Sequence, residues 1–98
     1  MNSVDDEYNK VVNGFEVFQN QPNPMVDQTL IEFILPKAEN VNLTIYNVAG
    51  EVVFEKNNEF SQGRNSLLIQ RSDLFMSGVY YYTLTAGGLT STRKMIVQ

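Results

Sequence analysis

The sequence contains no cysteine, no histidine and no tryptophan. Disulfides, thiolate nucleophiles and imidazole bases are therefore excluded, as are most zinc sites. Carboxylates and hydroxyls remain for chemistry, but the acidic residues stand mostly one at a time. The cluster of Asp5, Asp6 and Glu7 lacks the spacing of a calcium-binding EF-hand loop, so a surface role is favoured there over a cation site. We expect no catalytic residues, no cofactor and no metal, and hence no enzyme.

Long apolar runs and an excess of basic charge are also missing. No run approaches the roughly 20 apolar residues that span a bilayer, and the start "MNSVDDEYNK" has neither the basic nor the apolar region of a signal peptide. The seven Lys and Arg residues are scattered and the net charge is -4. We expect no membrane insertion, no nucleic-acid partner and no export signal in this stretch of chain.

What the sequence does contain is typical of one soluble globular domain. It has 98 residues, of which 43% are apolar and 18% charged. Residues 1–14 hold Asn, Asp, Ser and Gly with few apolar groups, which favours a flexible leader or linker. The domain proper is predicted to cover residues 15–98.

Short segments with alternating apolar residues follow one another along the predicted domain, separated by turn residues. The expected strands are residues 15–20, 29–35, 39–48, 51–57, 63–70, 79–86 and 89–98. Seven short strands at roughly ten-residue spacing, without sustained helical periodicity, predict an all-β fold. The architecture they favour is an immunoglobulin-like antiparallel β-sandwich of about seven strands, in which residues 72–78 cross from one sheet to the other.

The alternation also predicts which side chains face the core. Those expected inside are Ile31, Phe33, Leu35, Val41, Leu43, Ile45, Val52, Phe54, Leu67, Ile69, Tyr80, Tyr82, Leu84 and Ala86. For the last strand two patterns are possible, because either Met95 with Val97 or Ile96 could be the buried set. Tyr81 falls on the opposite face from Tyr80 and Tyr82, where packing on the sheet surface is expected.

Proline and glycine residues mark the turns. Pro22, Asn23 and Pro24 end the first strand, and we interpret them as a shape-giving turn rather than a partner contact. Gly50 and Gly78 are expected at tight turns. The dipeptide at residues 87–88 suits a two-residue hairpin turn.

Several of these motifs, in this order and spacing, resemble the C-terminal sorting domain, type A, of cargo proteins of the type IX (Por) secretion system. They are Asn23-Pro24, Thr29-x-Ile31-x-Phe33, Leu35-Pro36, Ile45-Tyr46-x-x-x-Gly50, Gly78-x-Tyr80, and Lys94 before an apolar end. The resemblance spans about residues 15–98. One departure is Ile69, where many relatives carry Trp or another large residue, and it concerns core packing.

The resemblance implies a sorting signal that travels behind a larger N-terminal cargo, so the chain is expected to be a C-terminal fragment. Such domains are recognised, once folded, in the periplasm by the outer-membrane translocon, and a surface protease commonly removes them. We expect the cut in or just before residues 1–14, because proteases act on exposed, weakly packed backbone. The cargo then stays on the outer-membrane surface or is released. The family places the transport signal near the end, in Lys94, Met95, Ile96, Val97 and Gln98. We expect a partner to bind an exposed strand edge or the terminal hairpin through main-chain hydrogen bonds, with side-chain pockets that give specificity.

Two other functions remain open on the same fold. One is an immunoglobulin-like or fibronectin-like accessory module that binds carbohydrate or a neighbouring domain, with the tyrosines at residues 80–82 as its platform. The other is a hydrolase, which needs two carboxylates about 5 to 9.5 Å apart across a cleft that so small a sandwich hardly offers.

Overall fold

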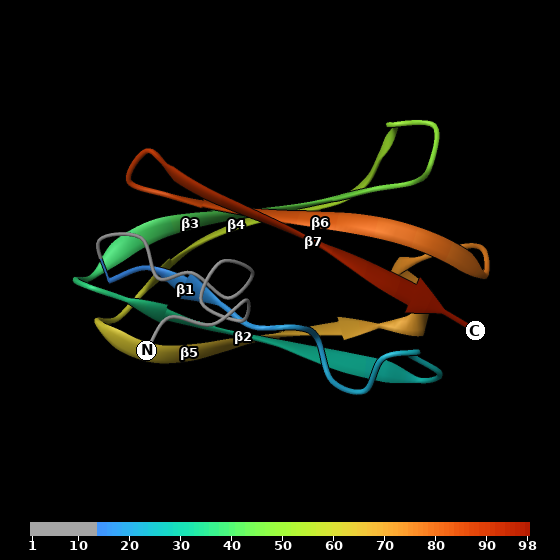
Figure 1. Ribbon diagram of the computed structural model, residues 1–98, viewed down its shortest axis with the longest axis horizontal. Helices are drawn as coiled ribbons and strands as arrows, with labels where there is room; N and C mark the ends of the chain where they lie inside the picture. The colour runs from blue at the N-terminus through green and yellow to red at the C-terminus, as the bar shows by residue number, and fades with distance from the viewer. Residues whose placement is uncertain (1–13) are drawn as a thin grey trace, which may run out of the picture.

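The computed structural model describes residues 14–98, which form two antiparallel sheets packed face to face (Figure 1). The elements are β1 (Glu16–Val17), β2 (Gln28–Leu35), β3 (Glu39–Tyr46), β4 (Val52–Phe60), β5 (Gly63–Gln70), the 3-10 turn η1 (Arg71–Asp73), β6 (Gly78–Ala86) and β7 (Leu89–Val97). No helix within this part of the chain is long and apolar enough to cross a membrane. The predicted leader falls almost wholly outside the described residues, as do Asp5, Asp6 and Glu7.

The strand order is β1-β2-β5 in one sheet and β4-β3-β6-β7 in the other, and every ladder is antiparallel. The predicted all-β sandwich of seven strands is therefore confirmed. In the constant-type immunoglobulin arrangement the fourth strand lies beside the fifth, whereas β4 here pairs with β3. The segment from η1 to β6 crosses between the sheets, as predicted from residues 72–78.

The core between the sheets contains the predicted inward faces of β2, β3, β5 and β6, together with residues that alternation did not predict, such as Met25 and Leu74. Its buried apolar residues are Phe15, Val17, Met25, Ile31, Phe33, Leu35, Val41, Leu43, Ile45, Leu67, Ile69, Leu74, Tyr80, Tyr82, Leu84, Ala86, Met95 and Val97. Phe33 and Phe60 pack edge to face across it, with ring centroids 5.0 Å apart. In β7 the buried set is Met95 with Val97, while Ile96 faces solvent.

Two hairpins have the turns expected from glycine. Gly87 and Gly88 connect β6 to β7 with φ of 55° and 85°, and two successive positive φ angles define a type I′ turn. Gly50 lies in the β3–β4 turn with φ of 84°. Its N–H donates to the Asn47 carbonyl at 3.0 Å. Both turns need a residue that tolerates the left-handed region.

The first strand is shorter than predicted. Residues 15–20 were expected to form it, but only Glu16–Val17 pair regularly with β2. The chain then touches β2 intermittently, since the Phe18 N–H donates to the Glu32 carbonyl and the next contact is the bridge of Gln21 to Leu30. The ladder breaks between these contacts, where the Asn20 side chain is buried.

The expectation that Val52 is a core residue is wrong. Val52 is 54% exposed, whereas Val53 and Phe54 are half-buried and pack against the core. The cause is an irregularity in the β3–β4 ladder, where Ile45 pairs with Phe54 but the next residue, Tyr46, pairs with Val52. Val53 is the extra residue of a β-bulge, and an extra residue reverses the inside–outside alternation.

Candidate functional site

The residues in which the transport signal was predicted form the end of β7, an outer strand of the four-stranded sheet, and the residue that follows it, Gln98. Met95 and Val97 are buried, with 0% and 2% of their surface exposed. Lys94, Ile96 and Gln98 are exposed. The five residues thus divide into two core anchors and three side chains that a partner can reach.

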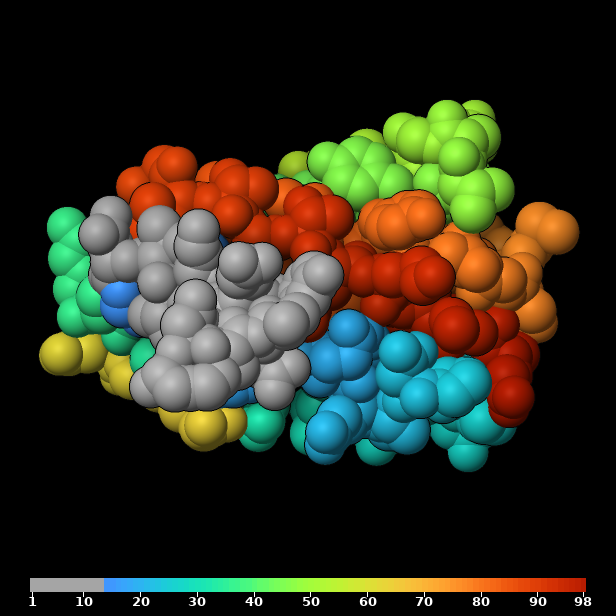
Figure 2. Space-filling model, in the orientation of Figure 1, coloured from blue at the N-terminus to red at the C-terminus, as the bar shows by residue number. Residues whose placement is uncertain are grey.

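Residues 19–25, which we call the strap, run along the free edge of this strand end (Figure 2). The Met25 N–H donates to the Ile96 carbonyl at 2.8 Å, and the Gln98 N–H donates to the Met25 carbonyl at 2.9 Å. The Ile96 N–H donates to Asn23 Oδ1 at 2.9 Å. Further back, Gln19 Nε2 donates to the Lys94 carbonyl at 2.7 Å. The strap therefore satisfies the outward main-chain groups of the strand end from the Lys94 carbonyl onward.

This arrangement corrects the expected mode of recognition. A partner strand can add to a sheet only where edge N–H and C=O groups are unpaired. At Ile96 and Gln98 those groups already bond to the strap. Recognition of the strand end through its main chain is wrong for the folded domain, and exposed side chains remain for a partner to bind.

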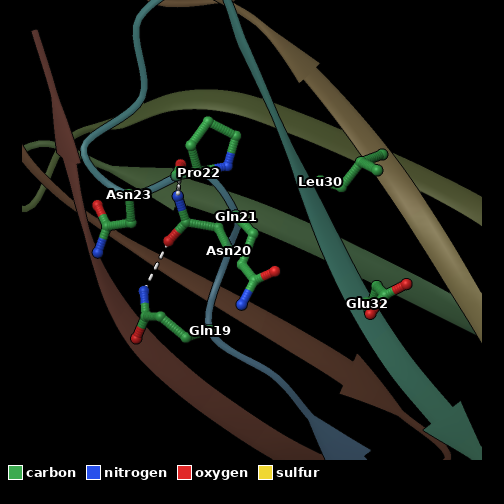
Figure 3. Close-up of a pocket in the computed structure, with 7 residues that line it drawn as sticks. All are labelled: Gln19, Asn20, Gln21, Pro22, Asn23, Leu30 and Glu32. Carbon is green, nitrogen blue, oxygen red and sulfur yellow. Dashed lines mark hydrogen bonds between the residues drawn. The ribbon is translucent and has the colours of Figure 1, made fainter.

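The strap is held in place by a buried asparagine (Figure 3). Asn20 is 0% exposed, and its Nδ2 donates to the Pro22 carbonyl at 3.2 Å and to Thr29 Oγ1 at 3.0 Å. Its own N–H donates to the Tyr82 hydroxyl at 2.9 Å, which in turn donates to the Phe18 carbonyl at 3.0 Å. Buried polar groups that are fully hydrogen-bonded specify one arrangement. Asn20 and Tyr82 thus set the path of the strap from inside.

Pro22, Asn23 and Pro24 form the turn of the strap, and the peptide bonds preceding both prolines are cis. The turn interpretation fits this geometry, and Asn23 has a second role because its side chain bonds to β7. Beside the turn lies an open hollow of about 740 Å³. Its walls are Gln19, Asn20, Gln21, Pro22, Asn23, Leu30 and Glu32 (Figure 3). Three of its four amides, those of Gln19, Asn20 and Asn23, bond to the protein itself.

The Tyr82 hydroxyl makes this network sensitive to alkaline pH. Burial raises the pKa of Tyr82 from its usual 10.0 to about 12, and the hydrogen bond from Asn20 and the charge of Arg93 offset only part of the effect. The phenol ionises more easily in the unfolded chain than in the folded one. Its contribution to stability is therefore complete below about pH 10 and is lost as the pH rises from 10 towards 12.

We expect Tyr82→Phe to be less stable than the wild type at pH 8, because it loses two hydrogen bonds worth about 1 kcal/mol each. Towards pH 11 this difference should shrink, by on the order of 1 kcal/mol, since only the wild type carries the buried phenol. Urea unfolding of both proteins at pH 8 and pH 11 measures the difference. A difference that does not change with pH would contradict the role assigned to the Tyr82 hydroxyl.

Two further family-motif residues lie at the start of β6, beside the end of β7, where Gly78 pairs with Val97 and Tyr80 with Met95. Gly78 begins β6 with φ of 141°, and nothing lies within 4 Å of the place a Cβ would take, so conformation rather than space requires glycine. Tyr80 is buried, and its hydroxyl donates to the Met76 carbonyl at 2.6 Å. Gly78 and Tyr80 therefore anchor the loop that precedes β6.

Sequence reasoning missed the roles of Asn20, Met25 and the Tyr82 hydroxyl. Tyr82 was correctly predicted as a core residue, but alternation gives no information on the partner of its hydroxyl. Asn20 and Met25 lie in an irregular segment, where the two-residue alternation of a strand cannot predict which side chains are buried. The one available signal was the density of amides around two prolines in "QNQPNP", which marks a turn without showing what the turn contacts.

The tyrosine platform of the accessory-module hypothesis does not form as a surface. Tyr80 and Tyr82 are buried, and Tyr81 alone of the three is exposed. Within residues 14–98 no group of three or more acidic side chains is placed to hold a metal ion.

The fold and the strapped terminal strand define a small β-sandwich module of immunoglobulin-like type. The model of one family, the secretion system C-terminal sorting domain, matches residues 21–98, and the chain belongs to that family. Its role is that of a type IX secretion sorting signal for an N-terminal cargo bound for the cell surface or the extracellular space. The comparison with curated proteins found no match.

Proposed function

We propose that the folded domain is recognised in the periplasm by the type IX translocon through residues 94–98, which are the end of β7 and the residue after it. The cargo then crosses the outer membrane, and a cell-surface protease removes the domain by cutting in or just before residues 1–14. The observation that carries the proposal is the family match over residues 21–98, which contains residues 21–25 of the strap and all of β7.

The geometry supports recognition of a folded surface. Lys94, Ile96 and Gln98 project to solvent from a strand that is anchored on one side by buried Met95 and Val97 and on the other by the strap. Arg71 Nε also donates to the Gln98 carbonyl at 3.0 Å, so the last residue is held as well. A pre-ordered strand end loses little conformational entropy when a partner binds.

An export assay tests the proposal. A reporter with its own N-terminal export signal is fused ahead of the full 98-residue chain and produced in a host that has the type IX system. We expect the reporter at the cell surface, and its mass should show loss of the domain. The same fusion in a host without the translocon, and the reporter without the domain, should both stay in the periplasm.

Surface delivery that is equal in the two hosts would refute the sorting role. Periplasmic retention of the intact fusion in the type IX host would favour an accessory module that binds carbohydrate or a neighbouring domain. A surface product that keeps the full mass would remove the protease from the proposal and leave the sorting role intact.

A further inference from the structure

One half of the outer face of the four-stranded sheet is apolar. Tyr46 pairs with Tyr81, and Tyr81 pairs with Lys94, so these three side chains form a row across β3, β6 and β7. The neighbouring pair is Val79 with Ile96. All five alternate with buried core residues and therefore point outward. We call this surface the Tyr81 face.

The other half of the same outer face is polar. Thr83 and Thr92 form a cross-strand pair with hydroxyls 2.8 Å apart, and Thr85 pairs with Thr90 beyond them. Threonine satisfies the strand preference of an exposed position without exposing a large apolar group. The stability of the sheet therefore does not require tyrosine or isoleucine on its outer face. The outer face thus has two distinct parts, a polar one with threonines and an apolar one with Tyr81 and Ile96.

The apolar surface continues around the end of the sandwich, where the green β3–β4 turn and the orange start of β6 adjoin (Figure 2). A pocket of about 390 Å³ there is lined by Val48, Phe75, Met76 and Val79 among others. Phe75 is 92% exposed and Val48 75%. Nine large apolar side chains are exposed in residues 14–98, and five of them, Val48, Phe75, Met76, Tyr81 and Ile96, lie on the Tyr81 face or around this end. A sixth, Val52, is the cross-strand partner of Tyr46. Apolar groups gathered in this way mark an interaction surface.

Lys94 indicates what kind of partner fits. Within residues 14–98 no carboxylate is within ion-pair distance of its ammonium group, and Tyr81 is its cross-strand neighbour. A partner that covers this face takes Lys94 out of water, which is costly unless an anion pairs with it. A second copy packed symmetrically would place two Lys94 side chains near each other. An anionic lipid surface is disfavoured by the net charge of -4.

We propose that the Tyr81 face is the surface that the translocon binds, and that its occupant is a protein surface with an apolar groove and a carboxylate for Lys94. This inference rests on the proposed function and specifies its binding surface. The strap then has an indirect role, because it holds β7 so that Lys94 and Ile96 keep their register beside Tyr81 and Val79.

The export assay with paired variants tests the inference. Tyr81→Thr/Ile96→Thr keeps strand propensity and removes the apolar surface, so surface delivery should fall about ten-fold or more. The matched control is Leu30→Thr/Leu68→Thr on the outer face of the other sheet. These two residues are a cross-strand pair exposed by 42% and 41%, close to the 41% of Tyr81 and 37% of Ile96. Surface delivery by the control variant should stay within about two-fold of delivery by the intact domain. All variants should melt cooperatively.

The charge is tested separately with Lys94→Gln and Lys94→Glu. Pairing with a carboxylate predicts that delivery falls further with Glu than with Gln, because Glu adds repulsion to the lost attraction. Equal delivery by both variants would overturn the carboxylate assignment.

The export assay distinguishes a failure of the Tyr81 face from a failure of the sorting role. If the intact domain delivers the reporter and Tyr81→Thr/Ile96→Thr delivers it equally well, the Tyr81 face is wrong and the sorting role stands. If the intact domain delivers nothing, both proposals fall. Sedimentation of the purified chain that shows a dimer broken by the double substitution would assign the face to a second copy. Binding to phosphatidylglycerol vesicles that the double substitution abolishes would assign it to lipid. Either result overturns the inference.

Discussion

Ile45→Asp is expected to abolish the cooperative thermal melt of the domain. Ile45 is 0% exposed in the middle strand pair of the larger sheet, between Phe54 and Tyr82. Removing its side chain costs about 2 to 5 kcal/mol, and burying an unpaired carboxylate adds several more. The sum approaches or exceeds the roughly 5 to 15 kcal/mol that stabilise a domain. Circular dichroism during heating measures the loss.

Thr90→Asp is the matched control, because it places the same carboxylate on an exposed position of β7. It should lower stability by at most about 1 kcal/mol. A melt of Ile45→Asp that resembles the melt of Thr90→Asp would show that the assignment of the β3 core face is wrong. In the export assay, Ile45→Asp should reduce delivery to background, because the proposed recognition depends on a folded surface.

Deletion of residues 94–98 is expected to unfold the domain and to block export at the same time. The deletion removes Met95 and Val97, both fully buried, together with the strap bonds of Ile96 and Gln98. Loss of two large core side chains alone costs about 4 kcal/mol or more. Blocked export after this deletion therefore cannot separate a lost signal from a lost fold, which is why the Tyr81 face is tested with surface substitutions.

Deletion of Gln98 alone separates the two contributions to stability. It removes the hydrogen bonds to Met25 and from Arg71 but leaves both core anchors in place. We expect a cooperative melt with stability lowered by about 1 to 2 kcal/mol. A truncated protein without residues 94–98 that melts as cooperatively as the Gln98 deletion would contradict the anchoring role of Met95 and Val97.

The inward faces of β2, β3, β5 and β6 were predictable from the sequence because a strand alternates with a period of two. Ile31, Leu43 and Leu84 illustrate this, as each is 0% exposed where the pattern placed it. The hairpin at residues 87–88 was predictable because a two-residue turn with positive φ needs glycine. The ordered motifs also sufficed for the resemblance to sorting domains, which the family match confirms.

Where regular alternation stops, only the tertiary structure decided the outcome. The bulge at Val53 exposes Val52, and a period of two cannot show where an extra residue is inserted. The choice of Met95 with Val97 over Ile96 required the register of β7 against β6. Asn20, buried against Tyr82 at a sequence separation of 62 residues, fixes a strap whose partners are distant in the chain. Local sequence therefore determined the strands and the family, whereas long-range packing determined which side of the terminal strand is closed and which is open to a partner.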